Sequence, residues 1–262
     1  MITRLVTLIL LVLSLDLALA ARPDAAVVFQ SNARVQSDAQ VPFHIGEKLT
    51  YDVSWSRVIT AGRAILSVVD RKVLSGGRAG YTLQAEAQSV SAAAKLSTLY
   101  YKTESVLDAV TLGAVQLSTY SNENGLVSSK NILIGPNSAD IEVRSTTNSR
   151  KRLSLPANTV DALGALYVIR TMTARRGESR MISIIDGDHV SRLQVTFGGR
   201  ELISTRLGKL TGWRVTPSLL DEHGRHGRSL TLWLSDDGAR KPLRFEAALP
   251  IGSVVLTLAN AK

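Results

Sequence analysis

Apolar residues recur at every second position along several stretches of the sequence, and this feature constrains the fold more than any other. Residues 49–56, 81–88 and 192–197 all follow the pattern, and in the first of them every second residue from Leu49 to Trp55 is apolar. A period of two is typical of a β-strand that buries one face and leaves the other in water. The pattern therefore predicts a mainly β fold.

Turn sequences that contain glycine separate the alternating stretches. They are Gly76-Gly77, Asn124-Gly125, Gly135-Pro136-Asn137, Asp186-Gly187 and Gly198-Gly199. Such sequences accommodate the positive φ angles of tight hairpin turns, so consecutive strands lie antiparallel to each other. No glycine-rich fingerprint joins a strand to a helix, which excludes a dinucleotide-binding fold. We expect an antiparallel meander that forms a curved sheet or a nearly closed β-barrel.

The segment 158–176 departs from the strand pattern and predicts one amphipathic helix. The residues at helical spacing are Val160, Leu163, Leu166, Tyr167 and Ile169 or Arg170. Asn158 or Thr159 is suited to cap the start of this helix, and Gly177 is suited to end it. A single helix in a β protein must bury its apolar stripe, so we expect it to pack on the concave side of the curved sheet.

The N-terminal residues 1–20 have the features of a signal peptide. An arginine precedes a nearly unbroken apolar run over residues 5–13, and Ala18-Leu19-Ala20 supplies a small-residue cleavage site. Residues 21–41 are polar and small and are expected to form a flexible lead-in, followed by a single β-rich domain over 42–262. The mature chain is therefore expected to be exported and soluble, with no transmembrane span after cleavage.

The amino-acid composition excludes several kinds of site and partner. The chain has no cysteine, so a disulfide framework, a thiol nucleophile and a thiolate metal site are excluded. Its net charge of +9 favours anionic neighbours such as envelope lipids or acidic glycans. Only 5% of the residues are aromatic, which leaves few platforms for stacking nucleic-acid bases. We expect no nucleic-acid partner and no cofactor.

The stretch from Ser235 to Pro242 contains two adjacent carboxylates, which suggest either a hairpin turn or a catalytic pair. Alternating apolar runs flank it on both sides. Neighbouring residues of a strand point to opposite faces, so Asp236 and Asp237 do not converge on one atom unless the turn rotates them. We interpret Asp236, Asp237 and Gly238 as a structural turn in which Gly238 takes a left-handed conformation. Arg240 is expected to pair with either aspartate.

Three further features suggest binding or catalysis. Glu47 precedes the first strand and suits either a ligand or a structural partner, such as Lys48 or an arginine across the sheet. Trp233 alternates with its apolar neighbours and is expected to be exposed or to face a ligand. Glu47, Trp233 and Arg240 are therefore the candidate ligand-binding residues. Asp221, His223 and His226 form a metal-like group, but their spacing defines no metal geometry, so we predict no metal site.

Three motifs in order resemble the family known as domain of unknown function 3108. The first comprises Phe43, Gly46, Glu47, Leu49, Tyr51, Val53 and Trp55, then Ala61-Gly62. The second is the segment from Asp161 to Arg170, and the third runs from Trp233 to Leu243 and is followed by Gly252-Ser253. The resemblance covers roughly residues 43–258. It implies an exported protein of a bacterial envelope and supplies no catalytic residues.

These observations favour a non-enzymatic periplasmic protein that binds an anionic or amphiphilic envelope component (lipid, lipopolysaccharide or glycan) or acts as a scaffold. One alternative is a hydrolase or metal-dependent enzyme that uses the loop with Asp221, His223 and His226. A further alternative is an outer-membrane barrel, because transmembrane strands alternate too. The polar outer faces of the strands and the scarcity of aromatic residues oppose that alternative.

Overall fold

The structure is a computed structural model that describes residues 41–55, 59–90, 98–187, 189–220, 224–249 and 252–262. Its strands are β1 (Lys48–Trp55), β2 (Ile59–Val73), β3 (Ala79–Ser89), β4 (Leu99–Asp108), β5 (Ala114–Glu123), β6 (Leu126–Ile134), β7 (Ser138–Arg144), β8 (Ser149–Ser154), β9 (Ser179–Asp186), β10 (His189–Thr205), β11 (Gly208–Leu220), β12 (His226–Ser229), β13 (Thr231–Ser235), β14 (Pro242–Leu249) and β15 (Gly252–Ala261). The helices are η1 (Ser75–Gly77) and α3 (Ala162–Thr171). The predicted signal peptide and nearly all of the lead-in lie outside these residues, so both stay predictions.

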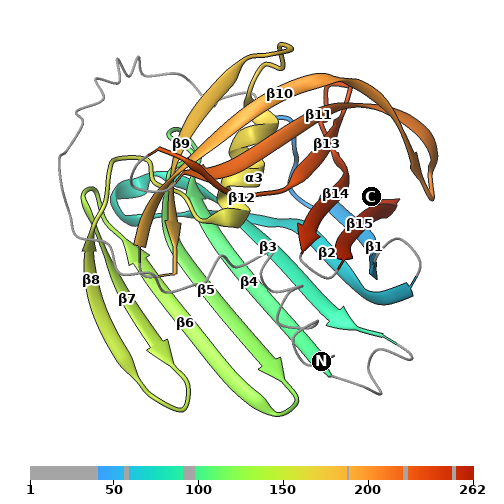
Figure 1. The fold of residues 1–262 in the computed structure, drawn as a ribbon. Coiled ribbons are helices and arrows are strands. Elements are labelled where there is room, and N and C mark those ends of the chain that lie inside the picture. The colour runs from blue at the N-terminus through green and yellow to red at the C-terminus, as the bar shows by residue number, and fades with distance from the viewer. Residues whose placement is uncertain (1–40, 56–58, 91–97, 188, 221–223, 250–251) are drawn as a thin grey trace.

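The strands form one antiparallel sheet whose first and last strands meet in its middle. The order is β8-β7-β6-β5-β4-β3-β2-β1-β15-β14-β13-β11-β10-β9, and β12 pairs with β11. From β1 the chain meanders outward to the border strand β8, crosses to the other border at β9, and meanders back to β15 (Figure 1). Lys48 and Lys262 exchange two backbone hydrogen bonds, of 3.1 and 3.0 Å, where β1 and β15 meet.

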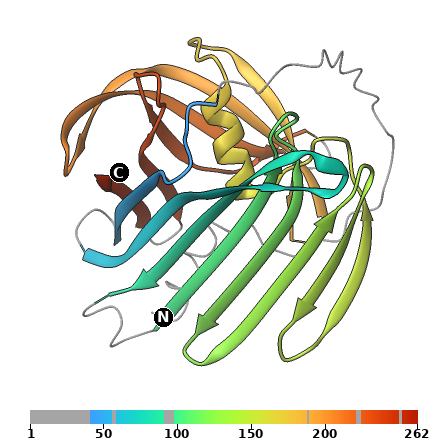
Figure 2. The ribbon, with the colours of Figure 1, turned by 180° about the vertical axis from the view of Figure 1, so that it is seen from behind.

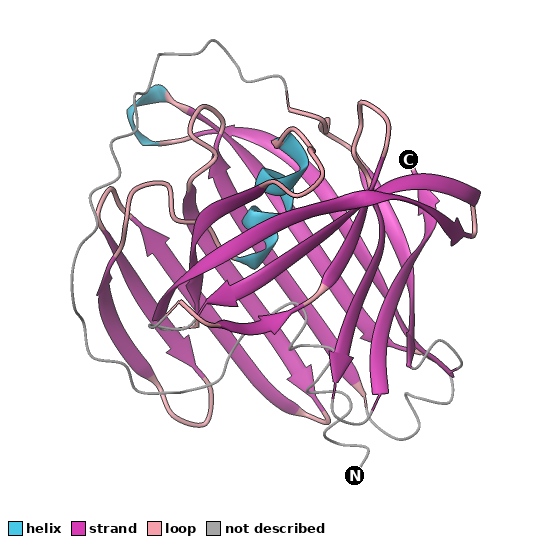
Figure 3. Ribbon diagram, turned by 45° about the horizontal axis from the view of Figure 1, so that its top comes forward, coloured by secondary structure: helices cyan, strands magenta, loops and turns pink. Residues whose placement is uncertain are grey.

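The sheet curves around α3, which connects its two borders. Figures 1 and 2 show the helix between the half formed by β2–β8 and the half formed by β9–β13, and Figure 3 shows it inside the curve of the sheet. The border strands β8 and β9 do not pair with each other, so the sheet stays open. The prediction of a curved antiparallel meander with one helix on its concave side is confirmed.

The alternation in the sequence corresponds to burial on the concave face. Leu49, Tyr51 and Val53 are at most 1% exposed and belong to a large apolar core that also includes the buried face of α3. A second, smaller core lies between β5–β7 and β9 and includes Ile132 and Ile185. Burial of these apolar side chains is the main favourable term in the stability of such a sheet.

The helix is shorter than predicted. Asp161, not Asn158 or Thr159, is its N-cap, and its side chain accepts hydrogen bonds from two backbone N–H groups. The reason is that Val160 is still extended: its N–H donates to Ser183 O at 3.0 Å in β9. At the other end α3 stops at Thr171, and Gly177, with φ of 83°, lies in the turn before β9.

One of the predicted turns is a bulge inside a strand. Gly198-Gly199 was expected to separate strands, but β10 continues through it, and the pairing with β11 skips from Phe197 to Arg200. Gly198 and Gly199 lie opposite Arg214 alone, and this one extra residue bends the β10–β11 hairpin, as bulges generally do. A side chain at Gly198 would bring its Cβ within 3.2 Å of Arg214 Cβ, so the close crossing of the two strands favours glycine here.

Beyond this bulge the end of the hairpin, residues 200–212, lies across β13–β15, and we refer to it as the strap. Arg206 N donates to Leu258 O at 3.1 Å, and the Arg206 guanidinium pairs with Asp52 of β1. Ile203 is buried underneath, while Leu202, which points the other way, is 64% exposed. Figure 1 shows this part of β10 and β11 arching past β13. The strap therefore adds a second layer on the outer face of the sheet.

Candidate functional site

Two charged side chains lie buried where the helix meets the first strand. Arg170 in the last turn of α3 is 0% exposed, and Glu47 directly before β1 is 1% exposed. The guanidinium donates two hydrogen bonds to the carboxylate, from Nη1 to Oε1 at 2.6 Å and from Nη2 to Oε2 at 2.8 Å. Such a bidentate pair is strong and directional. It offsets part of the cost of removing both charges from water.

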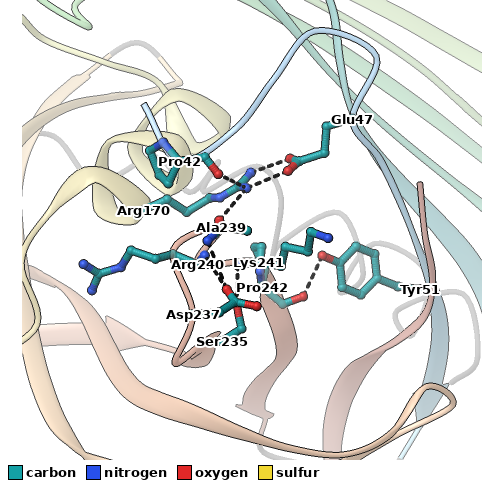
Figure 4. Close-up of polar contacts among 10 residues, drawn as sticks. All are labelled: Pro42, Glu47, Tyr51, Arg170, Ser235, Asp237, Ala239, Arg240, Lys241 and Pro242. Atoms are coloured by element: carbon teal, nitrogen blue, oxygen red, sulfur yellow. Dashed lines mark hydrogen bonds and ion pairs between the residues drawn. The ribbon is translucent and has the colours of Figure 1, made fainter. Parts of the chain in front are cut away.

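The same guanidinium reaches two backbone carbonyls from distant parts of the chain. Nη2 donates to Pro42 O at 3.2 Å and to Ala239 O at 3.0 Å. Figure 4 shows Arg170 between the entry segment with Glu47 and the connection from β13 to β14. Three segments that are far apart in sequence thus meet at a single cation.

Aromatic rings enclose this ion pair. The centre of the Arg170 guanidinium lies 5.0 Å from the ring centroid of Tyr167 and 5.5 Å from that of Phe43, within the range of cation–π attraction. Tyr51 stands on the neighbouring strand, and its hydroxyl donates to Pro242 O at 2.9 Å. Burial raises the pKa of both phenols, Tyr51 and Tyr167, well above the ordinary value.

The contacts of the cluster join three segments of the chain. Both oxygens of Glu47 accept hydrogen bonds from Arg170, and the two phenols keep their protons at neutral pH. A general base must be within reach of the proton it removes, whereas this carboxylate is enclosed and engaged. Glu47 does pair with an arginine, as one of the sequence expectations had it, but the arginine comes from the helix and not from across the sheet.

The stretch from Ser235 to Pro242 forms a hairpin turn between β13 and β14, which supports the structural interpretation of its aspartates. Asp237 Oδ1 accepts hydrogen bonds from Ser235 Oγ at 2.6 Å and from the backbone N–H groups of Ala239 and Arg240 at 3.1 and 3.0 Å. Asp236 instead accepts from Trp213 Nε1 at 2.6 Å and pairs with Arg200 at 2.9 Å. The two carboxylates therefore serve different partners.

Two details of this turn differ from the sequence expectation. The left-handed residue is Arg240, with φ of 45°, and not Gly238. The ion pair at Asp236 is made by Arg200, whose guanidinium also lies 4.9 Å from the ring centroid of Trp213, and not by Arg240. The reason for the first difference is that Asp237 fixes the turn through the N–H of Arg240 itself. The Arg240 side chain is half-buried, and this burial lowers its pKa.

Trp233 lies on the outer face of the sheet, opposite Leu232 and Leu234, but the expectation that it is exposed is wrong. Trp233 is only 8% exposed because the strap covers it. Its Nε1 donates to Glu201 Oε2 of the strap at 2.7 Å, and the Arg244 guanidinium lies 5.5 Å from the ring centroid. A tryptophan with a buried ring and a satisfied N–H is typical of a structural contact.

A second buried polar contact, which the sequence did not suggest, holds the other end of the helix. The carboxylate of Asp161 accepts hydrogen bonds from Leu163 N at 2.9 Å, Gly164 N at 3.2 Å and Ser105 Oγ of β4. Burial raises the pKa of this carboxyl, against the lowering effect of these hydrogen bonds. Both ends of α3 are thus tied to the surrounding chain by polar side chains.

The proposed enzymatic loop lies largely outside the described residues. Asp221 and His223 belong to the undescribed segment 221–223, and only the backbone of His226 is described, at the start of β12. Among the side chains that are described, no three His, Cys, Asp or Glu residues gather closely enough to hold a metal ion. Within the same part of the chain, no helix has both the length and the apolarity needed to cross a membrane.

The geometry defines a class of protein: an open, curved antiparallel sheet wrapped around a helix whose ends are fixed by buried polar contacts. The family described as protein of unknown function DUF3108 matches residues 50–259. The chain therefore belongs to the DUF3108 family, as the three sequence motifs suggested.

Two solved structures are similar to this chain, and the first of them supports the fold. A β-barrel-like protein of the family of unknown function DUF1849 from Brucella abortus is 11% identical, with a TM-score of 0.59, and the match covers 83% of this chain and 97% of that one. An exported-protein candidate with a YmcC-like fold from Bacteroides fragilis is 9% identical, with a TM-score of 0.36, and covers 85% of this chain and 98% of its own. No curated protein matches the sequence.

Proposed function

We propose that this protein is a non-enzymatic, exported protein of the bacterial periplasm that binds an anionic or amphiphilic envelope component (lipid, lipopolysaccharide or glycan) on its outer surface, or that acts as a scaffold there. The observation that carries the proposal is that a helix lies in the concave side of the sheet. The helix occupies it and is fixed by an enclosed ion pair between Arg170 and Glu47. A helix packed in the concave side favours a surface-binding protein over a carrier that encloses its ligand.

The outer surface offers charge of the required sign. The chain carries a net charge of +9. Several arginine side chains of β7 and β8 are more than half exposed: Arg144 is 65%, Arg150 82% and Arg152 73% exposed. Exposed cations attract anionic partners over about 8 Å at physiological ionic strength, and added salt weakens this attraction.

The proposal is tested with the purified protein in vesicle flotation, using phosphatidylglycerol vesicles, phosphatidylcholine vesicles and lipopolysaccharide micelles. We expect binding to at least one of the two anionic preparations, a loss of binding as NaCl rises, and a raised melting temperature of the bound protein. An unrelated basic protein of similar net charge serves as the control for charge alone. No binding by a folded sample, or binding no stronger than that of the control, overturns a specific binding role.

A further inference from the structure

The two border strands of the sheet differ in whether another segment of the backbone pairs with them. At the β9 border, Val160 pairs with the strand: its N–H donates to Ser183 O at 3.0 Å, and its carbonyl accepts from Ile185 N at 2.8 Å. At the β8 border, β7 pairs on one side, and no strand of the described residues pairs on the other (Figures 1 and 2). Val160 thus covers part of the β9 border, whereas no strand of the described chain pairs with the outer side of β8.

The register shows which backbone groups of β8 face outward. Leu155 N donates to Asn137 O at 2.9 Å, and Leu153 is opposite Ala139. In an antiparallel pair, hydrogen-bonded and non-hydrogen-bonded positions alternate, so Leu153 and Lys151 also direct their backbone groups toward β7. The N–H and C=O groups of Arg150, Arg152 and Ser154 therefore point away from the sheet. They form the hydrogen-bonding edge that an added strand requires.

The side chains along this border are cationic on both faces. Arg150 and Arg152 extend on one face, where they pair with Glu142 and Asp140 of β7, at 3.0 and 2.7 Å, and they remain 82% and 73% exposed. Lys151 is exposed on the opposite face. An additional strand beside β8 would therefore place its side chains next to positive charge whichever face they occupy.

This charge decides between two possible occupants. A second copy that paired antiparallel through its own β8 would set Arg150 and Arg152 against cations, and like charges directly opposite each other destabilise a strand pair. An acidic segment would instead gain opposite charges together with the backbone hydrogen bonds. Addition of an extended peptide to a free sheet edge is a general mode of recognition.

We propose that β8 is a docking edge for an extended acidic segment of another protein, which pairs with the outward N–H and C=O groups of Arg150, Arg152 and Ser154. The side-chain charges favour the acidic partner, and the backbone holds it as an additional antiparallel or parallel strand. This inference goes beyond the proposed lipid or glycan binding and does not depend on it.

The test uses an acetylated and amidated octapeptide in which glutamate alternates with threonine and valine, together with two variants of the protein. Arg152→Ala removes one cation but keeps the backbone N–H. Arg152→Pro removes the same cation and the outward N–H, and it leaves the bonds to β7 intact because this N–H does not face β7. The comparison of the two variants therefore isolates the backbone donor.

We expect the wild type to bind the peptide and not a version with glutamine in place of glutamate, as measured by fluorescence anisotropy. Arg152→Pro is expected to bind about 2- to 10-fold more weakly than Arg152→Ala, the loss that corresponds to one hydrogen bond. Equal affinities of the two folded variants would show that charge alone attracts the peptide, and this outcome overturns the proposal. Failure of the wild type to bind, or its dimerisation through β8, overturns it too.

Amide hydrogen exchange provides a second measurement in case Arg152→Pro does not fold. Addition of the peptide to the wild-type protein is expected to slow the exchange of the N–H groups of Arg150 and Arg152. The N–H of Lys151, which already faces β7, is expected to change little. Equal slowing of all three, or of none, contradicts strand addition. Loss of peptide binding with retained binding to anionic vesicles separates a failure of this inference from a failure of the proposed function.

Discussion

Arg170 and Glu47 are charges at positions where the sequence pattern calls for apolar residues. Arg170 is seven residues after Leu163, on the buried stripe of α3, and Glu47 is two residues before Leu49, on the buried face of β1. Each would be costly alone in the core, because an unpaired buried charge has lost its hydration. Together they neutralise each other's charge and fix the end of the helix against the start of the sheet.

Removal of one member of this pair is expected to destabilise the protein strongly. Arg170→Met leaves the Glu47 carboxylate buried without its partner, and we expect a loss of roughly 3–5 kcal/mol in the free energy of unfolding, measured by urea denaturation at pH 7. The double variant Glu47→Gln with Arg170→Met is expected to recover part of this loss. Arg144→Met, which removes an exposed partner of Glu142, is the control and should change stability far less. A single variant as stable as this control would contradict a structural role for the pair.

Asp161 is expected to make stability depend on pH in the direction opposite to most carboxylates. Burial raises its pKa above the ordinary value of 3.8, so the folded state binds its proton more tightly than the unfolded state does. The resulting stabilisation is complete below the unfolded pKa and is lost as the pH rises through the folded pKa. The wild type should therefore lose stability relative to Asp161→Asn as the pH rises from below 3.8, as urea denaturation at a series of pH values would show.

Asp140 supplies a control of opposite sign for this experiment. Its hydrogen bond from Arg152 lowers the pKa of the Asp140 carboxyl below 3.8, so its contribution is present above the unfolded pKa and is lost as the pH falls. The free energy of unfolding of the wild type should rise slightly relative to that of Asp140→Asn as the pH rises. If Asp161→Asn follows the same trend as Asp140→Asn, the raised pKa of Asp161 is wrong.

At the scale of elements, the strap explains why a tryptophan on the outer face of the sheet is buried. Two adjacent residues of the strap have side chains that point in opposite directions. Ile203 packs against the sheet, whereas Leu202 points to solvent. The bulge at Gly198-Gly199 bends the hairpin, and the residues beyond it lie across β13–β15. The position of the strap therefore depends on this bulge, on the buried Ile203 and on polar contacts with β1, β13 and β15.

Ile203→Asp is expected to lift the strap away from Trp233. In a background with Trp55→Phe and Trp213→Phe, the emission of the remaining tryptophan should shift to longer wavelength, and acrylamide should quench it more strongly. Leu202→Asp introduces the same charge one residue away on the exposed side and should leave both signals unchanged. An equal response of the two variants would mean that the strap does not depend on its buried face.

The sequence patterns predict the elements of this fold better than their contacts. Alternation and turn residues indicate β1, β3, β10 and the β13–β14 hairpin, because burial of one face leaves a period of two in the residues themselves. The charge at Arg170 could have been recognised as buried from its helical spacing. Its partner could not, since 123 residues separate Arg170 from Glu47 and no local pattern encodes that distance. Gly198-Gly199 illustrates the same limit: a bulge and a hairpin turn require the same flexible residues.

At the scale of the whole molecule, protection of backbone amides should decrease from the middle of the sheet toward β8. The seam between β1 and β15 has paired strands on both sides, so its amides should exchange slowest with deuterated solvent. Along β8, the N–H groups of Lys151 and Leu153 should exchange more slowly than those of Arg150 and Arg152. The measurement is amide exchange by NMR, and uniform exchange along β8 would contradict the assigned register.

The pairing of the first strand with the last also has a consequence for folding during synthesis of the chain. The ribosome synthesises the chain from its N-terminus. β1 therefore cannot pair with β15 until residues 252–262 have been synthesised. Contacts across such a long separation form late and fold slowly. The middle of the sheet is thus completed only after residues 252–262 have been synthesised, and until then β1 has a partner strand on one side alone.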